Sequence, residues 1–208
     1  MADSQALHPE LVLASSSPSR RELLARLGLP FQVLPANIDE SRREAEPPRD
    51  YVRRLAEAKA RAMAGPGRLV VGADQVAALD GVEIFGKPGN RERAQRQLQA
   101  LSGREVEFVS GLCLLHPSGR MQLDCVATRV RFRQLSPACI EAYLERERVL
   151  GCAASFRSEG LGLCLAEWVR GDDPSSLIGL PLVRLTEMLA REGLDPLLAS
   201  LPEEPVVS

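Results

Sequence analysis

One stretch decides how this chain folds: Leu11-Val-Leu-Ala-Ser-Ser-Ser-Pro-Ser-Arg-Arg21. Its apolar start is typical of a buried strand. Serine followed by proline signals a helix start, because proline at the first helical position needs no partner for its missing N–H. The unpaired N–H groups and partial positive charge of a helix start attract anions. Arg20 and Arg21 add cations where the helix dipole disfavours them, which indicates either an anion site or solvated arginines.

Outward from this stretch, helices alternate with strands around one long hairpin. Strands are expected at 11–14, 31–34, 69–72 and 161–165, and helices at 18–27, 49–64, 91–101 behind an Asn90 cap, 137–146 and 180–191. Segments 105–116 and 120–133 flank a Pro-Ser-Gly turn and indicate an antiparallel hairpin, and Asp80-Gly81 marks a second turn. This pattern predicts an α/β fold with a mixed sheet flanked by helices. Residues 11–193 are expected to form one domain with two lobes around a cleft, with loose termini at 1–10 and 194–208.

The composition excludes several classes of protein. The 208 residues carry a formal net charge of −2, so no nucleic-acid polymer is expected as a partner. No apolar run approaches the roughly 18 residues of a membrane span, and the N-terminus does not resemble a secretory signal. The five cysteines are odd in number and form no CxxC pair, which favours a reducing cytoplasm. With two histidines and no GxGxxG or P-loop motif, a general base would be a carboxylate.

Two residues stand where chemistry is expected. Asp74 follows the apolar run 69–72, and open α/β sheets bind ligands at the carboxyl ends of their strands. Asp74 is therefore either a general base or a residue that caps a turn. Lys59 falls on the apolar stripe of the helix 49–64, so it is either buried with a partner or reaches solvent at the edge of the stripe.

Two loops add further charges. Lys87 stands between Gly86 and Pro88, which display it on a stiff loop, although this tripeptide alone is a weak motif. Asp39 and Glu40 can either hold a hard divalent cation or remain a solvated pair. The set of cations and acids that these positions supply suits a metal-assisted attack of water on a phosphoanhydride.

Read in order, these motifs resemble the Maf family of nucleotide pyrophosphatases. The matching segments span most of residues 11–193 and are Leu13-Ala-Ser-Ser-Ser-Pro-Ser-Arg-Arg-Glu-Leu-Leu24, Ile38-Asp-Glu40, Leu55-Ala-Glu-Ala-Lys-Ala60, Gly72-Ala-Asp-Gln75, Gly86-Lys-Pro88, Ser158-Glu-Gly160 and Asp173-Pro-Ser-Ser-Leu-Ile-Gly-Leu-Pro181. The resemblance implies a fold like that of inosine-triphosphate pyrophosphatases and a divalent metal, Mg²⁺ or Mn²⁺. It also implies hydrolysis of a nucleoside triphosphate to a monophosphate and pyrophosphate.

The resemblance further implies roles for single residues. Asp74 matches the proton acceptor, and Ser19, Gln75 and Glu159 match positions that select the base. The pair Gln75 and Glu159 resembles that of the branch of the family that acts on 7-methyl-GTP. The resemblance implies that this branch removes modified nucleotides. That branch usually carries an aromatic residue where Ser19 stands, and an aromatic face would stack on the cationic 7-methylguanine ring. The acidic Glu159 suits the N1–H and N2–H₂ donors of guanine.

The predicted site combines these roles. Its members are Ser15, Ser19, Arg20, Arg21, Gln75 and Glu159 for substrate binding, Asp74, Lys59 and Lys87 for catalysis, and Asp74 with Glu40 for the metal. Three alternatives remain open: a pyrophosphatase for another nucleoside triphosphate, a nucleotide-binding regulator of cell division without turnover, and a phosphatase that releases single phosphates. A homodimer is implied by the resemblance alone.

Overall fold

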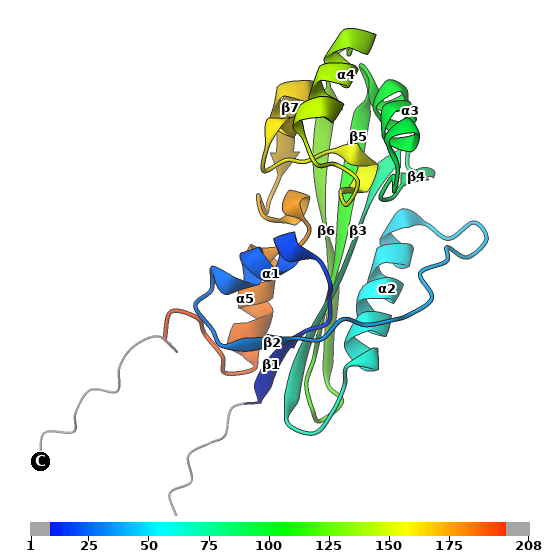
Figure 1. Cartoon of the computed structure of the whole chain (residues 1–208). Coiled ribbons are helices and arrows are strands. Elements are labelled where there is room, and N and C mark those ends of the chain that lie inside the picture. Colours follow the sequence, from blue (N-terminus) through cyan, green and yellow to red (C-terminus); the bar gives the residue numbers. More distant parts are fainter. Residues whose placement is uncertain (1–8, 199–208) are drawn as a thin grey trace, which may run out of the picture.

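The computed structural model describes residues 9–198 of the chain as a mixed sheet with helices on both faces (Figure 1). Within this range the strands are β1 (Glu10–Leu13), β2 (Phe31–Val33), β3 (Arg68–Leu79), β4 (Glu83–Phe85), β5 (Glu105–Leu115), β6 (Met121–Phe132) and β7 (Ala166–Gly171). The α-helices are α1 (Pro18–Ala25), α2 (Pro48–Ala62), α3 (Arg91–Leu101), α4 (Pro137–Arg146) and α5 (Leu182–Arg191). Short 3-10 helices are η1 (Ala153–Ser155), η2 (Leu161–Leu165) and η3 (Ser176–Ile178). The mixed α/β class predicted from the sequence is confirmed.

The sheet has the strand order β2-β1-β3-β5-β6-β7, with β4 beside β3. β1 runs parallel to β2 and β3, whereas the other pairs are antiparallel. β5 borders β3 from residue 70 to 79. On the opposite edge of β3, β1 covers residues 68–71 and β4 covers 77–79. Within the described residues, positions 72–76 therefore have no strand beside them on that edge, and Asp74 lies at the centre of this gap.

One face of the sheet is covered by α2, whose backbone approaches the strands closely. A Cβ added at Gly72 would lie 2.1 Å from the carbonyl oxygen of Ala56, and one added at Gly111 would lie 2.3 Å from that of Val52. Glycine is needed at both strand positions because the helix backbone occupies the space of a side chain. This close approach lets α2 present its side chains directly to the gap in β3.

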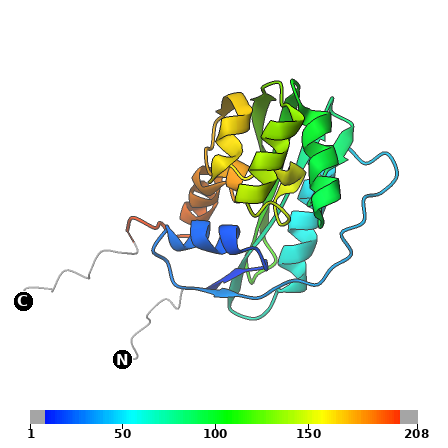
Figure 2. The same ribbon diagram turned by 45° about the horizontal axis from the view of Figure 1, so that its top comes forward.

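The other face carries two pairs of helices, α1 with α5 and α3 with α4 (Figures 1 and 2), and each pair packs on its own apolar cluster. α1 and α5 form one cluster with the β1 end of the sheet, including Leu13, Leu24, Val71, Leu112 and Leu185. α3 and α4 lie side by side and form the other, including Leu79, Leu98, Phe108, Phe132 and Ile140. Between the clusters the same face carries the polar side chains of Gln75, Ser110 and Thr128.

Most of the predicted elements are present, with three differences. β3 runs to Leu79 rather than ending before Asp74, because its pairing with β5 continues past that residue. The predicted strand 161–165 is the 3-10 helix η2, since Glu147 and the carbonyl of Arg157 bind its first N–H groups. The sheet strand is instead the following polar segment, β7, an edge strand on β6.

The termini also differ slightly from the prediction. β1 begins at Glu10, and Leu194 packs against the cluster of α1 and α5. Residues 10 and 194 therefore take part in the packed fold. Of the predicted loose termini, residues 1–8 and 199–208 lie outside the described residues.

The contact between α2 and β3 predicts a strong effect of one methyl group. We expect Gly72→Ala to lower the free energy of unfolding by about 1–3 kcal/mol, because the new Cβ must displace the backbone of α2. Urea denaturation at neutral pH measures this difference. Gly86→Ala is the matched control, since a Cβ there meets no atom within 4 Å. Equal stability of the two variants would contradict the close packing of α2.

Candidate active site

The start of α1 is built as the sequence predicts. Ser17 is the N-cap, and its hydroxyl accepts a hydrogen bond from the N–H of Arg20 at 3.4 Å, while Pro18 occupies the first turn. The guanidinium of Arg20 turns back into the protein. Its Nε donates to the carbonyl of Gly179 at 2.9 Å and its Nη1 to the Ser15 hydroxyl at 3.4 Å. The helix start thus carries a cation that is fixed from two sides.

Arg20 and Arg21 lie in different environments. Arg20 is only 9% exposed, and burial lowers the pKa of its guanidinium, an effect that the charges of Asp74 and Glu40 oppose. Arg21 is exposed because it lies about 100° further round the helix. The fold therefore brings one of the two predicted arginines into the site and leaves the other at the surface.

A buried lysine lies at the gap in the edge of β3. Lys59 Nζ is 2.6 Å from Asp74 Oδ1 and 2.7 Å from Glu40 Oε1. Lys59 and Asp74 are buried, whereas the side chain of Glu40 is 57% exposed. Burial raises the pKa of Glu40, but the hydrogen bond and the charge of Lys59 outweigh this effect and hold the pKa below its usual value. One ammonium group therefore joins a buried acid to an accessible one.

The two carboxylates fit a metal that is shared with a substrate. Magnesium is typically bound by one or two protein carboxylates together with substrate phosphates. Asp74 and Glu40 both contact Lys59 Nζ, so their carboxylates lie close together, and among residues 9–198 no group of three or more His, Cys, Asp and Glu could hold an ion. Asp39 turns away, because its carboxylate accepts the N–H of Ser41 at 2.9 Å.

The loop that carries Glu40 is fastened to α2. Arg54 donates to both carboxylate oxygens of Glu46, at 2.6 and 2.8 Å, and to the carbonyl of Ser41 at 3.0 Å. Tyr51 donates its hydroxyl to the carbonyl of Glu40 at 2.7 Å. The hydrogen bonds from Arg54 lower the pKa of Glu46 from 4.5 to about 2. This contact holds the position of Glu40 beside Lys59.

Gln75 points to the opposite side of β3. Its Nε2 lies 2.8 Å from the carbonyl oxygen of Ser176, 3.1 Å from that of Leu177 and 3.1 Å from the hydroxyl of Ser110. Because carbonyls only accept hydrogen bonds, the amide N–H₂ must face them. The amide oxygen is then left on the side of Gly179, where it can accept a hydrogen bond from a ligand.

A cleft lies on this side of the sheet. It lies between α1, the loop after β4 and the segment from η1 to Glu159. The residues that line it are Ser17, Ser19, Arg20, Gln75, Lys87, Gly151, Cys152, Ala153, Phe156, Glu159, Leu177, Ile178 and Gly179. Asp74 and Lys59 are outside this lining, on the α2 side of β3. The gap in the edge of β3 lies between the two groups.

Lys87 reaches the cleft from a loop that two elements hold. The carbonyl of Gly86 accepts hydrogen bonds from the N–H of Ala154 and from Nε2 of Gln97, both at 3.1 Å. Gln97 also accepts the hydroxyl of Ser155 at 2.6 Å. Ala154 and Ser155 have φ of 54° and 56°, a strained conformation that persists because these bonds fix it.

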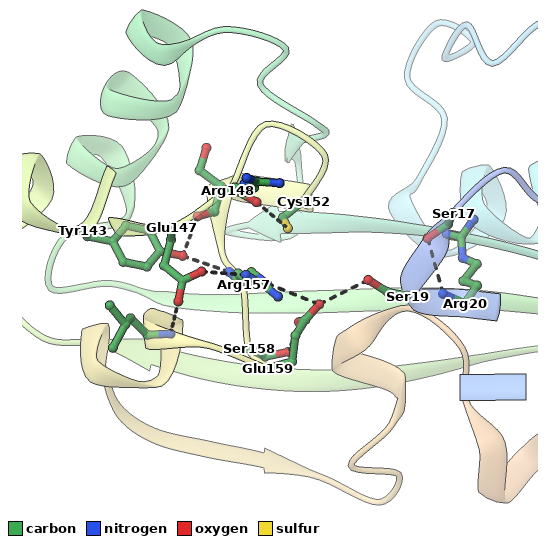
Figure 3. Close-up of polar contacts among 12 residues, drawn as sticks. Ser17, Ser19, Arg20, Tyr143, Glu147, Arg148, Cys152, Arg157, Ser158 and Glu159 are labelled. Carbon is green, nitrogen blue, oxygen red and sulfur yellow. Dashed lines mark hydrogen bonds and ion pairs between the residues drawn. The ribbon is translucent and has the colours of Figure 1, made fainter. Parts of the chain in front are cut away.

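Glu159 faces α1 across the cleft (Figure 3). The hydroxyl of Ser19 donates to its Oε1 at 3.2 Å, and Nε of Arg157 lies 3.8 Å from the same oxygen. Ser19 and Glu159 are 140 residues apart in sequence. Their contact places a carboxylate acceptor in the cleft, next to the start of α1.

Comparison with known families identifies the family of this chain. The family model described as Maf-like protein matches residues 10–192. The chain belongs to the Maf family. A Maf relative from Pseudomonas syringae pv. tomato, named 7-methyl-GTP pyrophosphatase, is 54% identical over 89% of this chain and 97% of its own length. One of the same name from Pseudomonas aeruginosa is 52% identical over 90% of this chain and 98% of its own length.

A solved structure of a nucleoside-triphosphatase, titled dITP/XTP pyrophosphatase, from Mycobacterium abscessus matches with a TM-score of 0.42 and 17% identity. It covers 61% of this chain and 74% of that one, and the assignment to the Maf family does not depend on it. In the part of the chain that the structure describes, no helix is long and apolar enough to cross a membrane.

In this Maf protein the predicted residues form two neighbouring groups. Lys59, Asp74 and Glu40 lie together on the α2 side of β3. Ser19, Arg20, Gln75, Lys87 and Glu159 line the cleft, and Ser15 supports Arg20 from beneath. Arg21 and Asp39 join neither group.

The sequence reasoning did not single out the residues that hold these groups. Asp173 is buried, and its carboxylate accepts the N–H groups of Ser175 and Val183, so it fixes the start of α5 beside η3. The Glu46–Arg54 pair was missed in the same way. Asp173 stands before a proline, which marks a turn. Its partner Val183, ten residues away, and the partner of Glu46, eight residues away, can be recognised only in the folded structure.

The Glu46–Arg54 pair predicts a dependence of stability on pH. Because the folded pKa of Glu46 is depressed, its contribution is present above its unfolded pKa, about 4.3, and is lost as the pH falls toward about 2. We expect Glu46→Gln to be less stable than the parent at pH 7 and nearer to it at pH 2.5. Urea denaturation at both values measures this. Glu44→Gln, an exposed neighbour, is the control, and an unchanged difference between the two values would contradict the assignment.

Proposed function

We propose that this protein is a nucleoside triphosphate pyrophosphatase that hydrolyses 7-methyl-GTP to 7-methyl-GMP and pyrophosphate. The observation that carries the reaction class is the buried Lys59 between Asp74 and Glu40, next to the buried Arg20. Such a group of cations and carboxylates is suited to bind a polyphosphate and activate water. The substrate is inferred from the shared name of relatives that are 51–54% identical over most of this chain.

Arg20 and the N-terminus of α1 bind the triphosphate in this proposal. The guanidinium is already oriented by Gly179 and Ser15, so little side-chain entropy is lost when it binds phosphate. Lys87 lies on the accessible side of the cleft and neutralises charge on the leaving pyrophosphate. Arg21, being exposed, contributes only at longer range.

Asp74 is the proton acceptor for the attacking water. The hydrogen bond from Lys59 holds Asp74 Oδ1, which leaves the other carboxylate oxygen to face the gap in β3. As the water oxygen bonds to phosphorus, its proton passes to Asp74 and the bond between the α- and β-phosphates breaks. Asp74 and Glu40 would also hold Mg²⁺ or Mn²⁺, which when bound polarises phosphate oxygens and neutralises their charge.

Gln75, Ser19 and Glu159 read the base. Glu159 accepts hydrogen bonds from the N1–H and N2–H₂ groups of guanine, and the oxygen of Gln75 offers one further acceptor. Methylation at N7 gives the ring a positive charge, which favours an acidic lining. Ser19 orients Glu159 and leaves the room that an aromatic ring would fill.

Other parts of the sequence prediction remain predictions. These are the division of residues 11–193 into two lobes of one domain, the homodimer, the cytoplasmic location and the absence of a nucleic-acid partner. The proposed reaction acts on a small-molecule nucleotide, and the proposal does not depend on any of these predictions.

A substrate panel with Mg²⁺ tests the proposed function. We expect 7-methyl-GTP to give the highest kcat/KM among 7-methyl-GTP, GTP, dTTP, UTP and CTP, with pyrophosphate and no orthophosphate as product. Enzyme-coupled detection of each product measures this. Preference for dTTP or UTP would overturn the substrate, orthophosphate would overturn the reaction, and tight binding without product would favour a regulator.

Asp74→Asn is the catalytic control for this panel. Loss of a positioned general base should lower turnover by about 10²–10⁴-fold. Asp50→Asn makes the same chemical change at an exposed position in the first turn of α2 and should keep the parent's turnover. Near-normal turnover of Asp74→Asn would overturn the assignment of the base.

The two arginines of α1 give a separate prediction. We expect Arg20→Gln to raise KM for the triphosphate at least about tenfold, because a charge-assisted contact to phosphate is lost. Arg21→Gln should raise KM less than about threefold, because an exposed charge is screened by salt. Steady-state kinetics at 0.15 M salt compares the variants. Equal effects would contradict the separation of the two side chains.

A further inference from the structure

α4 holds the loop that carries Glu159 at two points (Figure 3). Tyr143 accepts the N–H of Arg157 and donates to the carbonyl of Ser155, both at 3.0 Å. Glu147, one helical turn later, accepts the N–H of Leu161 at 2.6 Å. Both side chains are well buried: Tyr143 is 4% exposed, and the side chain of Glu147 is 8% exposed. The loop between these anchors includes Glu159.

Glu147 also packs directly against the loop backbone. A Cβ added at Gly160 would lie 2.3 Å from its Oε1, so a side chain there would displace the carboxylate. The backbone hydrogen bond from Leu161 and the charge of Arg157 hold the pKa of Glu147 below its usual value, although burial opposes them. Glu147 therefore carries a negative charge beside the backbone of Gly160 and Leu161.

Arg157 lies between two carboxylates, one of which is closer to its guanidinium than the other. Its Nη1 is 2.8 Å from Glu147 Oε2, whereas its Nε is 3.8 Å from Glu159 Oε1. The closer, less exposed acid holds the guanidinium, and the acid in the cleft keeps only a distant contact with it. An arginine in close contact with Glu159 would compete with the N–H groups of a nucleobase for the same oxygens.

We propose that Glu147 is a positioning residue for base recognition, which holds Arg157 back from Glu159 and so keeps the Glu159 carboxylate available to the guanine edge. This inference rests on the proposed reading of the base by Glu159. Glu147 does not line the cleft and acts through Arg157 and the loop backbone. It determines selectivity between bases rather than the breaking of the phosphoanhydride.

The test compares 7-methyl-GTP with 7-methyl-ITP, which differ only in the 2-amino group of the base. The readout is the ratio of the two kcat/KM values, because a general loss of stability changes both substrates alike. We expect Glu147→Gln to lower this ratio about tenfold, as for the loss of one charge-assisted hydrogen bond. Glutamine still accepts the N–H of Leu161 but no longer neutralises Arg157. Glu145→Gln, at an exposed position in the last turn of α4 two residues before Glu147, should leave the ratio unchanged.

Further variants at Arg157 and Glu159 make the result decisive. Glu147→Gln combined with Arg157→Gln should restore the ratio, because the competing cation is gone, and Glu147→Gln should have no added effect beside Glu159→Gln. If Glu147→Gln does not fold, Arg157→Gln alone must keep the ratio within about twofold, and a tenfold loss there would overturn the inference. An unchanged ratio in Glu147→Gln would overturn it as well. If Glu159→Gln itself leaves the ratio unchanged, the proposed base reading fails instead.

Discussion

A buried ammonium group needs a compensating charge, and the contacts of Lys59 follow from that requirement. The effective cost of burying an unpaired ion is several kcal/mol, and removal of one partner from a buried pair typically costs about 3–5 kcal/mol. Lys59 therefore requires Asp74 on β3, which in turn requires α2 to approach β3 at the distance that Gly72 permits. It also draws in Glu40 from a loop that would otherwise be solvated.

The same requirement explains the order of the loops around the site. Tyr51 and Arg54 of α2 hold the backbone that carries Glu40, because they donate hydrogen bonds to the carbonyls of Glu40 and Ser41. Arg20 enters from the opposite side of β3 and adds a second buried cation, whose burial the charges of Asp74 and Glu40 offset. Two cations and two acids thus compensate one another, and all of them except Glu40 are buried. A substrate with several negative charges can replace part of this compensation.

The sequence predicted the local features better than the distant ones. The Ser17–Pro18 helix start, the Asn90 cap and the hairpin of β5 and β6 depend on neighbouring residues, and all are present. Lys59 was recognisable because its position on an apolar helical stripe conflicts with its charge. Asp74 was placed at a strand end, whereas it lies within a strand, because only the partner strand determines where pairing stops. The contacts of Glu46 with Arg54 and of Glu147 with Leu161 join residues that only the fold brings together, and no local sequence pattern marks them.

Asp74 and Gln75 are neighbours in the chain, yet the pleat of β3 turns their side chains to opposite faces of the sheet. In the proposed mechanism one side chain serves bond cleavage beside Lys59 of α2, and the other faces the cleft that would hold the base. A lineage could therefore exchange the residue at position 75, or those opposite it on α1 and the loop of Glu159, without disturbing the acid–lysine contact. Such a division allows related proteins to diverge in the nucleotide they choose while inheriting one common reaction.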